Sequence, residues 1–390
     1  MSVAMETVPP IEGTWDPRFA AVREAFAANF EKHGEVGAAV AVTVEGRLVV
    51  DLWAGYADAT RTSSWRRDTL VNVFSVGKGP VALAALMLVD RGLLDLDRPV
   101  ARYWPELAGA GKATITTRQL LSHRAGLPAI RQPLPEESLF HWEDVIRALE
   151  SQEPWWPPGT RHGYHVNTFG FLVGETIRRI SGRTPGRFLR DEIAAPLDVD
   201  FHIGLDRRHH GRVAEVQWSS ESTASPRNVE DLSAEERLMM RNAYFNPPGL
   251  SGAGTVNTAA WREAEIPSAN AHATARAVAR IYAALAAGGT LDGVTVIGRD
   301  TLAAAAIEHS SGPDAVLGRS SRFGLGFQLP QPQRSFGRHA GTFGHFGAGG
   351  SVGFADPEAG IGFGYVMNRM GSRWQSPISR SLIDALYSCL

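Results

Sequence analysis

Apolar residues recur with strand-like spacing near both ends of this chain and with helical spacing between them. Residues 36–44 and 47–53 are rich in strand-forming residues, and they meet at Glu45-Gly46, a pair typical of a hairpin turn. Four later runs have the same character: residues 323–329, 342–347, 350–354 and 360–368. Because the two groups of strands lie at opposite ends of the chain, we expect them to join in one antiparallel sheet.

Helical repeats dominate the middle of the chain and also flank the strands. Residues 167–181 and 272–287 carry apolar side chains at helical spacing, and each run is followed by glycine, which commonly ends a helix. Asp16-Pro17 and Ser376-Pro377 each place a capping residue before a proline, which predicts a helix near either end of the chain. The predicted fold class is α+β, with an antiparallel sheet, flanking N- and C-terminal helices and an inserted, mainly helical region.

The same pattern predicts how the chain is divided. Residues 1–70 and 290–390 are expected to form one discontinuous domain around the sheet. Residues 71–289 are expected to form a mainly helical domain inserted between those two parts. The sequence shows no internal repeat and no low-complexity linker.

Composition narrows the class of protein and its partners. Of the 390 residues, 44% are hydrophobic and 21% are charged, as in an ordinary soluble globular protein. The formal net charge of -2 gives no reason to expect nucleic acid or an anionic membrane as partner. Cys389 is the single cysteine, so no intrachain disulfide can form. Residues 1–13 lack the features of a signal peptide, and the longest apolar run, residues 81–89, is too short to cross a bilayer, so we expect a cytoplasmic protein.

The strongest candidate chemistry lies at Ser75-x-x-Lys78. Residues three apart share one face of a helix, so the Lys78 amine can lie beside the Ser75 hydroxyl and accept its proton. Such a pair occurs by chance in many solvated helices, but residues 81–89 are apolar almost all round, which predicts a buried helix. Pro80 conflicts with a helix that begins at Ser75, so we expect the helix to begin late or to bend there.

Two other kinds of site fit the sequence less well. Gly77-Lys78 is similar to the end of a phosphate-binding loop, but Asn72 stands where glycine is needed and Gly79 stands where a hydroxyl would hold Mg²⁺. His162 and His165 lie close together, but the sequence has no cysteine pair and no H-E-x-x-H motif, so we expect no metal.

Ser351 is a second candidate nucleophile. Gly349-Gly350-Ser351-Val352-Gly353 matches the G-x-S-x-G motif, which requires a strand, a tight turn and a helix, and a histidine later in the chain. Here a strand and a proline-containing turn follow, and no histidine occurs after Ser351. We therefore expect Ser351 to have a structural role rather than a catalytic one.

Several motifs occur together in the order found in serine β-lactamase-like hydrolases. They are Phe74-Ser75-Val76-Gly77-Lys78, Leu120 to Leu127, Pro158-Gly159-Thr160 leading to Tyr164, and His345-Phe346-Gly347. Over nearly its whole length the chain resembles the branch that contains class C β-lactamases, serine D,D-peptidases and, most closely, family VIII carboxylesterases. The resemblance implies a β-lactamase/transpeptidase-like fold, an active site at the interface of the two domains, and no cofactor.

The resemblance also assigns residues to roles. It implies that Ser75 is the nucleophile, Lys78 its partner and Tyr164 the second proton carrier, without deciding which of the last two is the base in each step. The oxyanion hole is expected at the backbone N–H groups of Ser75 and Ala348. His345, Gly347 and Trp155 are expected to contact the substrate.

Two departures from the family pattern bear on the substrate. Tyr164 is followed by His165 and Val166, so that Asn167 comes one place later than in penicillin-recognising enzymes. The lysine that would meet an anionic substrate is replaced by His345, which is largely neutral at pH 7 if its pKa is ordinary. Both changes favour a neutral, small-molecule ester.

The predicted function is therefore hydrolysis of carboxylic esters through an acyl-enzyme on Ser75, and the resemblance to family VIII carboxylesterases implies short acyl chains. A β-lactamase or D,D-peptidase, an acyltransferase, and a catalytically silent binding protein on the same fold remain alternatives. The natural ester, its stereochemistry and the oligomeric state are left open by the sequence.

Overall fold

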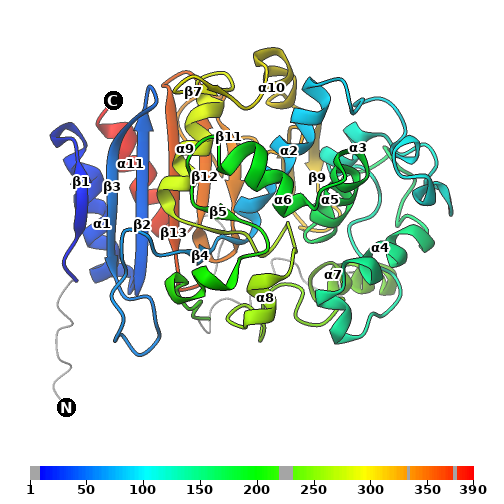
Figure 1. The fold of residues 1–390 in the computed structure, drawn as a ribbon, viewed down its shortest axis with the longest axis horizontal. Helices are drawn as coiled ribbons and strands as arrows, with labels where there is room; N and C mark the ends of the chain where they lie inside the picture. The colour runs from blue at the N-terminus through cyan, green and yellow to red at the C-terminus, as the bar shows by residue number, and fades with distance from the viewer. Residues whose placement is uncertain (1–8, 219–231, 332–333, 372–375) are drawn as a thin grey trace.

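A single antiparallel sheet built from both chain ends forms one side of the molecule (Figure 1). The computed structural model describes residues 9–218, 232–331, 334–371 and 376–390. The sheet has six strands in the order β1-β3-β2-β13-β12-β11. Their bounds are β1 Glu12–Trp15, β2 Gly37–Val44, β3 Arg47–Gly55, β11 Phe343–Phe346, β12 Val352–Asp356 and β13 Ile361–Met367. The α+β class and the pairing of the two chain ends agree with the prediction from sequence.

Helices cover the two faces of this sheet. Helix α9 (Ala275–Ala286) contacts β2, β12 and β13 and lies in front of the sheet in Figure 1. Its backbone approaches closely because Gly362 and Gly364 of β13 face it, and a Cβ at either glycine would lie 2.3 Å from an α9 carbonyl oxygen. Helices α1 (Ala20–His33) and α11 (Pro377–Ser388) contact each other and lie behind the sheet.

The rest of the chain is mainly helical and surrounds helix α2 (Lys78–Asp90), which is buried from Lys78 to Leu88. The other α-helices are α3 Thr117–Leu121, α4 Trp142–Ser151, α5 Thr168–Ser181, α6 Pro185–Leu189, α7 Ala234–Phe245, α8 Ala259–Glu263 and α10 Arg299–Ala305. The short strands are β4 Val71–Asn72, β5 Phe201–His202, β6 His272–Ala273, β7 Thr290–Leu291, β8 Val294–Thr295, β9 Ser310–Pro313 and β10 Ser320–Phe323. Helices α2 and α5 pack against each other at the centre of this region.

Three elements differ from the sequence prediction. The expected helix at 272–287 begins at Ala275, because His272 and Ala273 pair with β4 and β5 and Thr274 then caps α9. The expected strand at 323–329 is only partly formed, since β10 ends at Phe323 and Gln328 makes isolated bridges. Strand β1 was not predicted, because its four residues are all exposed and carry no alternating pattern.

The predicted division into domains 1–70 with 290–390 and 71–289 remains a prediction. The strands of the main sheet do come from residues 12–55 and 343–367, but α9 lies within 71–289 and packs on the sheet. In the part of the chain that the structure describes, no helix has both the length and the apolar character needed to span a bilayer.

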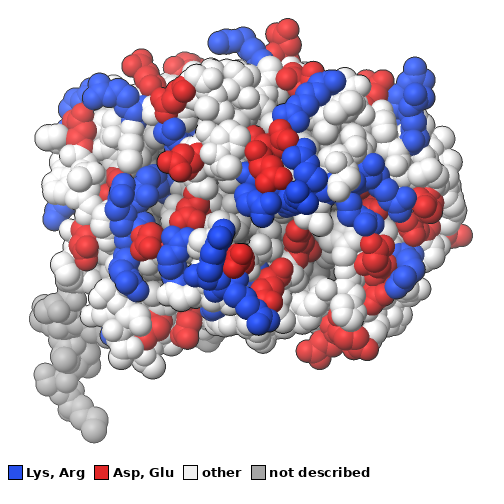
Figure 2. Space-filling model, viewed as in Figure 1, with Lys and Arg blue, Asp and Glu red and all other residues white. Residues whose placement is uncertain are grey.

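Basic and acidic side chains are interspersed over the face shown in Figure 2. Over α6, for example, Arg183, Arg187 and Arg190 each form an ion pair with Asp191. The basic residues there are therefore largely balanced by neighbouring carboxylates.

Candidate active site

Ser75 lies on a short 3₁₀ turn, Phe74–Gly77, that connects β4 to α2. Phe74 has a φ of 47°, in the left-handed region that is costly for a side chain of this size. The half-buried Ser75 is thus presented by a strained turn, and α2 proper begins at Lys78. Pro80 falls in the first turn of α2, where its missing N–H has no helical acceptor, so the conflict noted in the sequence is resolved by a late start.

Lys78 is fully buried, and its amine lies beside the serine hydroxyl. The distance from Lys78 Nζ to Ser75 Oγ is 2.9 Å, and Nζ also donates to the carbonyl oxygen of Ser268 at 3.0 Å. Burial lowers the pKa of Lys78 well below its ordinary value, because it removes the hydration of the ammonium. A neutral lysine amine can accept the serine proton.

Tyr164 lies beside the pair formed by Ser75 and Lys78. Its ring centroid lies 5.0 Å from Lys78 Nζ, and the residue is fully buried. Burial raises the pKa of Tyr164 well above its ordinary value, an effect that a hydrogen bond with Ser75 partly opposes. The phenol is therefore protonated at neutral pH and can donate a proton within the site.

Asp314 holds the backbone of Tyr164 in place. The N–H of Tyr164 donates to both carboxylate oxygens of Asp314, at 3.0 and 3.1 Å. The same fully buried carboxylate accepts from the N–H groups of Val316 and Leu317, each at 2.9 Å, and from Ser321 Oγ at 2.6 Å. All of these partners are donors, so Asp314 ties the Tyr164 backbone to its own turn and to β10.

Strand β11 brings His345 and Gly347 to the same place. His345 is fully buried, its Nδ1 donates to the Phe346 carbonyl at 2.9 Å, and its ring lies 5.9 Å from the Tyr164 ring. Burial, reinforced by Lys78, lowers the pKa of His345 to about 3, so its ring is neutral. Among the described residues, His345 Nε2 has no hydrogen-bond partner.

The end of β11 is fixed directly to the segment that precedes the nucleophile. Ser351 Oγ donates to the carbonyl of Val73 at 3.1 Å, and a Cβ at Gly347 would lie 2.5 Å from that same oxygen. Ala348 follows and opens a short 3₁₀ turn, Ala348–Gly350. Within the described ranges, neither the Ser75 N–H nor the Ala348 N–H donates to a backbone carbonyl of another element, which leaves both groups available for an oxyanion.

Trp155 is the remaining predicted site residue. Trp155 packs at the edge of the apolar cluster that contains Tyr164, with Nε1 donating to Ala129 O at 2.8 Å and the Arg131 guanidinium 3.9 Å from its ring. Its contact with substrate stays a prediction.

His162 and His165 bond to Ser321 and to the backbone of Leu127 and Gly163. In the described ranges, no group of three or more His, Cys, Asp or Glu side chains is placed to hold a metal ion.

Comparison with known proteins places this geometry in a family. A sequence profile of the Beta-lactamase family matches residues 22–385. The chain is 37% identical over 371 residues to the esterase/beta-lactamase LipL of Mycobacterium tuberculosis, an alignment that covers 92% of this chain and 83% of that protein. The chain belongs to the beta-lactamase family.

Solved structures agree with this assignment. A family VIII carboxylesterase is similar with a TM-score of 0.90 and 39% identity, and the match covers 98% of this chain and 100% of that one. A penicillin-binding protein homolog from Caulobacter crescentus is similar with a TM-score of 0.89 and 42% identity, again covering 98% of this chain and 100% of that one. The β-lactamase/transpeptidase-like fold and the family expected from the sequence are confirmed.

The structure of this beta-lactamase-family chain also contains residues that the sequence did not indicate. Asp314 and Ser268 contact Tyr164 and Lys78 from segments without any recognisable motif. Ser268 also accepts the Gly170 N–H with its hydroxyl, at 2.7 Å, so that it joins α5 to the buried amine. Asn167, which comes late in the family motif, donates to the Ala243 carbonyl at 2.9 Å.

Proposed function

We propose that this chain is a serine carboxylesterase that hydrolyses short-chain esters through an acyl-enzyme on Ser75. The observation that carries the proposal is the 2.9 Å distance between Lys78 Nζ and Ser75 Oγ, with the lysine fully buried. A neutral amine at this distance is a base for the serine hydroxyl. The related proteins include an esterase/beta-lactamase and a family VIII carboxylesterase, and the ester-hydrolase class predicted from the sequence is thereby confirmed.

Acylation begins with attack of Ser75 Oγ on the ester carbonyl carbon while Lys78 takes the hydroxyl proton. The carbonyl oxygen becomes an oxyanion, which the N–H groups of Ser75 and Ala348 stabilise. The C–O bond to the alcohol then breaks, and the leaving alkoxide takes the phenolic proton of Tyr164. Lys78 returns its extra proton to Tyr164, so both groups regain their starting forms.

Deacylation uses the same groups. Water attacks the acyl carbon as Lys78 takes one of its protons, and the second oxyanion forms in the same hole. Its collapse breaks the bond to Ser75 Oγ, which recovers its proton from Lys78 and releases the carboxylic acid. The pKa of Lys78, lowered by burial, and the pKa of Tyr164, raised by burial, match these roles of acceptor and donor.

The surroundings of Ser75 favour a substrate whose reacting part is neutral. The family's lysine on this strand is replaced by His345, and burial holds the pKa of His345 at about 3. With its single N–H donated to the Phe346 carbonyl, the neutral ring has only the acceptor Nε2 left, so it offers neither a charge nor a hydrogen bond to an anion beside the nucleophile.

The proposal is tested with a chromogenic short-chain ester such as 4-nitrophenyl butyrate. Ser75→Ala should reduce kcat by at least about 10³-fold with unchanged circular dichroism, since the nucleophile is lost. Brief acylation of the wild-type chain should add the mass of one butyryl group on the peptide that contains Ser75. Turnover retained in Ser75→Ala would overturn the assignment.

The same preparation separates an esterase from a β-lactamase. Turnover of the neutral ester should exceed turnover of a cephalosporin at matched concentration. Faster cephalosporin hydrolysis would make the β-lactam activity primary.

A further inference from the structure

The segment Leu120 to Leu127, one of the motifs behind the family resemblance, lies against the loop that carries Tyr164. His123 is fully buried within this segment and follows the end of α3. Its φ of 61° lies in the left-handed region, which histidine adopts more readily than most residues with a side chain. The backbone therefore turns at His123, directly beside the Tyr164 loop.

Two hydrogen bonds join His123 to the residues on either side of Tyr164. The His123 carbonyl accepts the N–H of Gly163 at 3.1 Å. The ring Nδ1 of His123 accepts the N–H of His165 at 3.2 Å. The N–H of Tyr164 itself donates to Asp314, so each backbone N–H from Gly163 to His165 has an acceptor. His123 therefore fixes the backbone both before and after the proposed proton donor.

The second of these bonds requires a neutral His123 ring. Nδ1 accepts a hydrogen bond only when it carries no proton. Burial lowers the pKa of His123 well below its ordinary value, which favours the neutral ring. The pKa is shifted in the same direction by the neighbouring basic groups: His165, Lys78, His345 and His162. The burial that disfavours a charge on the ring thus preserves the acceptor for the Tyr164 loop.

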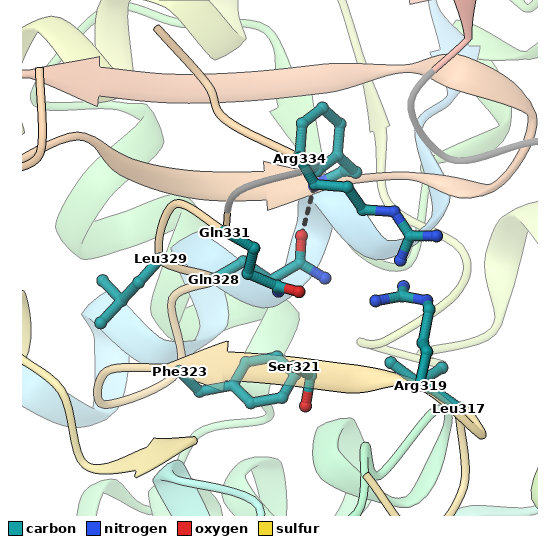
Figure 3. Close-up of a pocket in the computed structure, with 9 residues that line it drawn as sticks. Leu317, Arg319, Ser321, Phe323, Gln328, Leu329, Gln331 and Arg334 are labelled. Carbon is teal, nitrogen blue, oxygen red and sulfur yellow. Dashed lines mark hydrogen bonds between the residues drawn. The ribbon is translucent and has the colours of Figure 1, made fainter. Parts of the chain in front are cut away.

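The His123 ring also belongs to the aromatic packing around Tyr164. The centroids of the two rings lie 5.1 Å apart, and their planes are inclined at 61°. Phe323 stacks on the Tyr164 ring, with centroids 5.7 Å apart and planes 2° from parallel, and its centroid lies 4.5 Å from that of His123. Figure 3 shows Phe323 on β10 together with Ser321, whose hydroxyl bonds to Asp314. The Tyr164 ring therefore contacts both His123 and Phe323, which also contact each other.

We propose that His123 is a positioning residue that holds Tyr164 where its phenol can protonate the leaving alcohol. The inference rests on the proposed esterase function and adds to it the group that sets the position of the proton donor. Proton transfer requires the phenol to lie within hydrogen-bond reach of the alcohol oxygen. Without the Nδ1 acceptor, the buried N–H of His165 loses its partner, which favours a shift of the loop. A displacement of about 1 Å can slow a reaction by about 100-fold.

The leaving group of the ester separates a positioning role from a general effect on folding. A strongly basic alkoxide leaves slowly unless it is protonated, whereas 4-nitrophenolate is weakly basic and leaves without a proton. Ethyl butyrate and 4-nitrophenyl butyrate share their acyl group and give the same acyl-enzyme. The ratio of kcat/KM for the 4-nitrophenyl ester to kcat/KM for the ethyl ester therefore reports on proton donation during acylation. A loss of folded protein lowers both values equally and leaves this ratio unchanged.

His123→Leu removes the acceptor, so the ratio should rise by about tenfold or more, because the ethyl ester loses its proton donor. Tyr164→Phe is the reference and should raise the ratio at least as far. His123→Asn should keep the ratio within about threefold of wild type, since Asn Oδ1 supplies an acceptor in place of Nδ1 and asparagine adopts a left-handed φ. His272→Leu is the matched control: His272 is also fully buried but lies on β6, so the ratio should stay at the wild-type value.

A ratio that stays at the wild-type value in His123→Leu while Tyr164→Phe raises it overturns the proposal and leaves the esterase function standing. An equal rise in His272→Leu or in His123→Asn also overturns it, because the effect would then not depend on the acceptor at this position. Glycine adopts the same φ without an acceptor, so His123→Gly gives the comparison if leucine prevents folding. Absence of turnover of both esters by the wild-type chain counts against the esterase function, and an unchanged ratio in Tyr164→Phe counts against Tyr164 as proton donor; the proposal falls in both cases.

Discussion

Lys78 and Tyr164 have opposite protonation preferences that come from one cause. Burial disfavours the charged form of each group, so the pKa of Lys78 is well below its ordinary value and the pKa of Tyr164 is well above it. The two shifts favour the neutral form of each group, a free amine at Lys78 and a protonated phenol at Tyr164. These are the acceptor and the donor that the proposed cycle requires.

The pH dependence of the reaction should follow from these two residues. The active form of Lys78 is deprotonated, so kcat/KM for a neutral ester should be constant above the lowered pKa of Lys78 and fall as pH decreases through it. Because the pKa of Tyr164 is raised, no alkaline loss is expected below about pH 10. A rate profile from about pH 5 to about pH 10 checks this, and an alkaline decline near neutrality would contradict the assigned roles.

Asp314 acts on the reaction through the position of Tyr164. Asp314→Asn replaces an acceptor oxygen by an amide N–H that faces donors, so the Tyr164 backbone should shift. We expect kcat to fall roughly 10- to 100-fold with little change in KM, as for other small displacements of catalytic groups. Steady-state kinetics on a neutral ester measure both constants.

Asp356 provides the control for this substitution. It is also a fully buried aspartate, but it bonds to His339 and Tyr387 at the back of the sheet. Asp356→Asn should lower the melting temperature and leave kcat close to wild type. Equal losses of kcat in the two variants would mean that Asp314 has only a general structural role.

At the scale of elements, the contact between β11 and the turn that carries Ser75 sets the shape of the site. Two small residues make this contact: Gly347 leaves room for the Val73 carbonyl, and Ser351 bonds to it. The G-x-S-x-G motif therefore has a structural explanation, since Ser351 is buried, is followed directly by β12, and is engaged with the backbone.

Substitutions at these two positions should have unequal effects. Ser351→Ala removes one hydrogen bond, so we expect a loss of about 1 kcal/mol in the free energy of unfolding and an activity within a few-fold of wild type. Gly347→Ala places a Cβ 2.2 Å from Ser351 Oγ and 2.5 Å from Val73 O, so β11 must move away from Ser75 and most activity should be lost. Ester kinetics together with denaturant unfolding measure the pair; a silent Gly347→Ala would show that the oxyanion strand lies elsewhere.

Elements with strong local signals were predicted well. The hairpin of β2 and β3 turns at Glu45-Gly46, and α11 is capped by Ser376 as expected. Strand β1 carries no such signal, because it is exposed and is held only by its pairing with β3. Helix α9 begins three residues later than its apolar pattern, because tertiary pairing places His272 in a strand.

At the scale of the whole molecule, the site is assembled from segments that are distant in the sequence. Ser75 and Lys78 share one turn, so their spacing predicted their contact. Tyr164 and His345 were identified only through the family resemblance. Asp314 and Ser268 could not be predicted, because a lone aspartate or serine in a loop has the same local pattern whether or not folding brings it to an active site.

Buried neutral histidines should make the stability of the whole molecule sensitive to acid. Burial lowers the pKa of His165 to about 4 and of His272 and His345 to about 3, whereas an unfolded histidine titrates near its ordinary value of 6.5. At a pH between the lowered pKa of the folded protein and 6.5, the unfolded chain binds more protons than the folded one at these histidines. The free energy of unfolding should therefore fall as the pH decreases below 6.5. Above pH 6.5 these histidines should have no effect on it. At pH about 5.5 the loss should be about 1.4 kcal/mol for each histidine.

His272 isolates one part of this effect, because its side chain is fully buried and burial is the largest cause of its lowered pKa. His272→Leu removes a titrating group, so the difference in free energy of unfolding between about pH 7.5 and about pH 5.5 should shrink by about 1.4 kcal/mol. Exposed His33 gives the control, since His33→Leu should leave the difference unchanged. Urea unfolding at the two pH values makes the comparison. If His272→Leu keeps the full wild-type difference, the acid sensitivity arises from other groups, and burial of neutral histidines is not its cause.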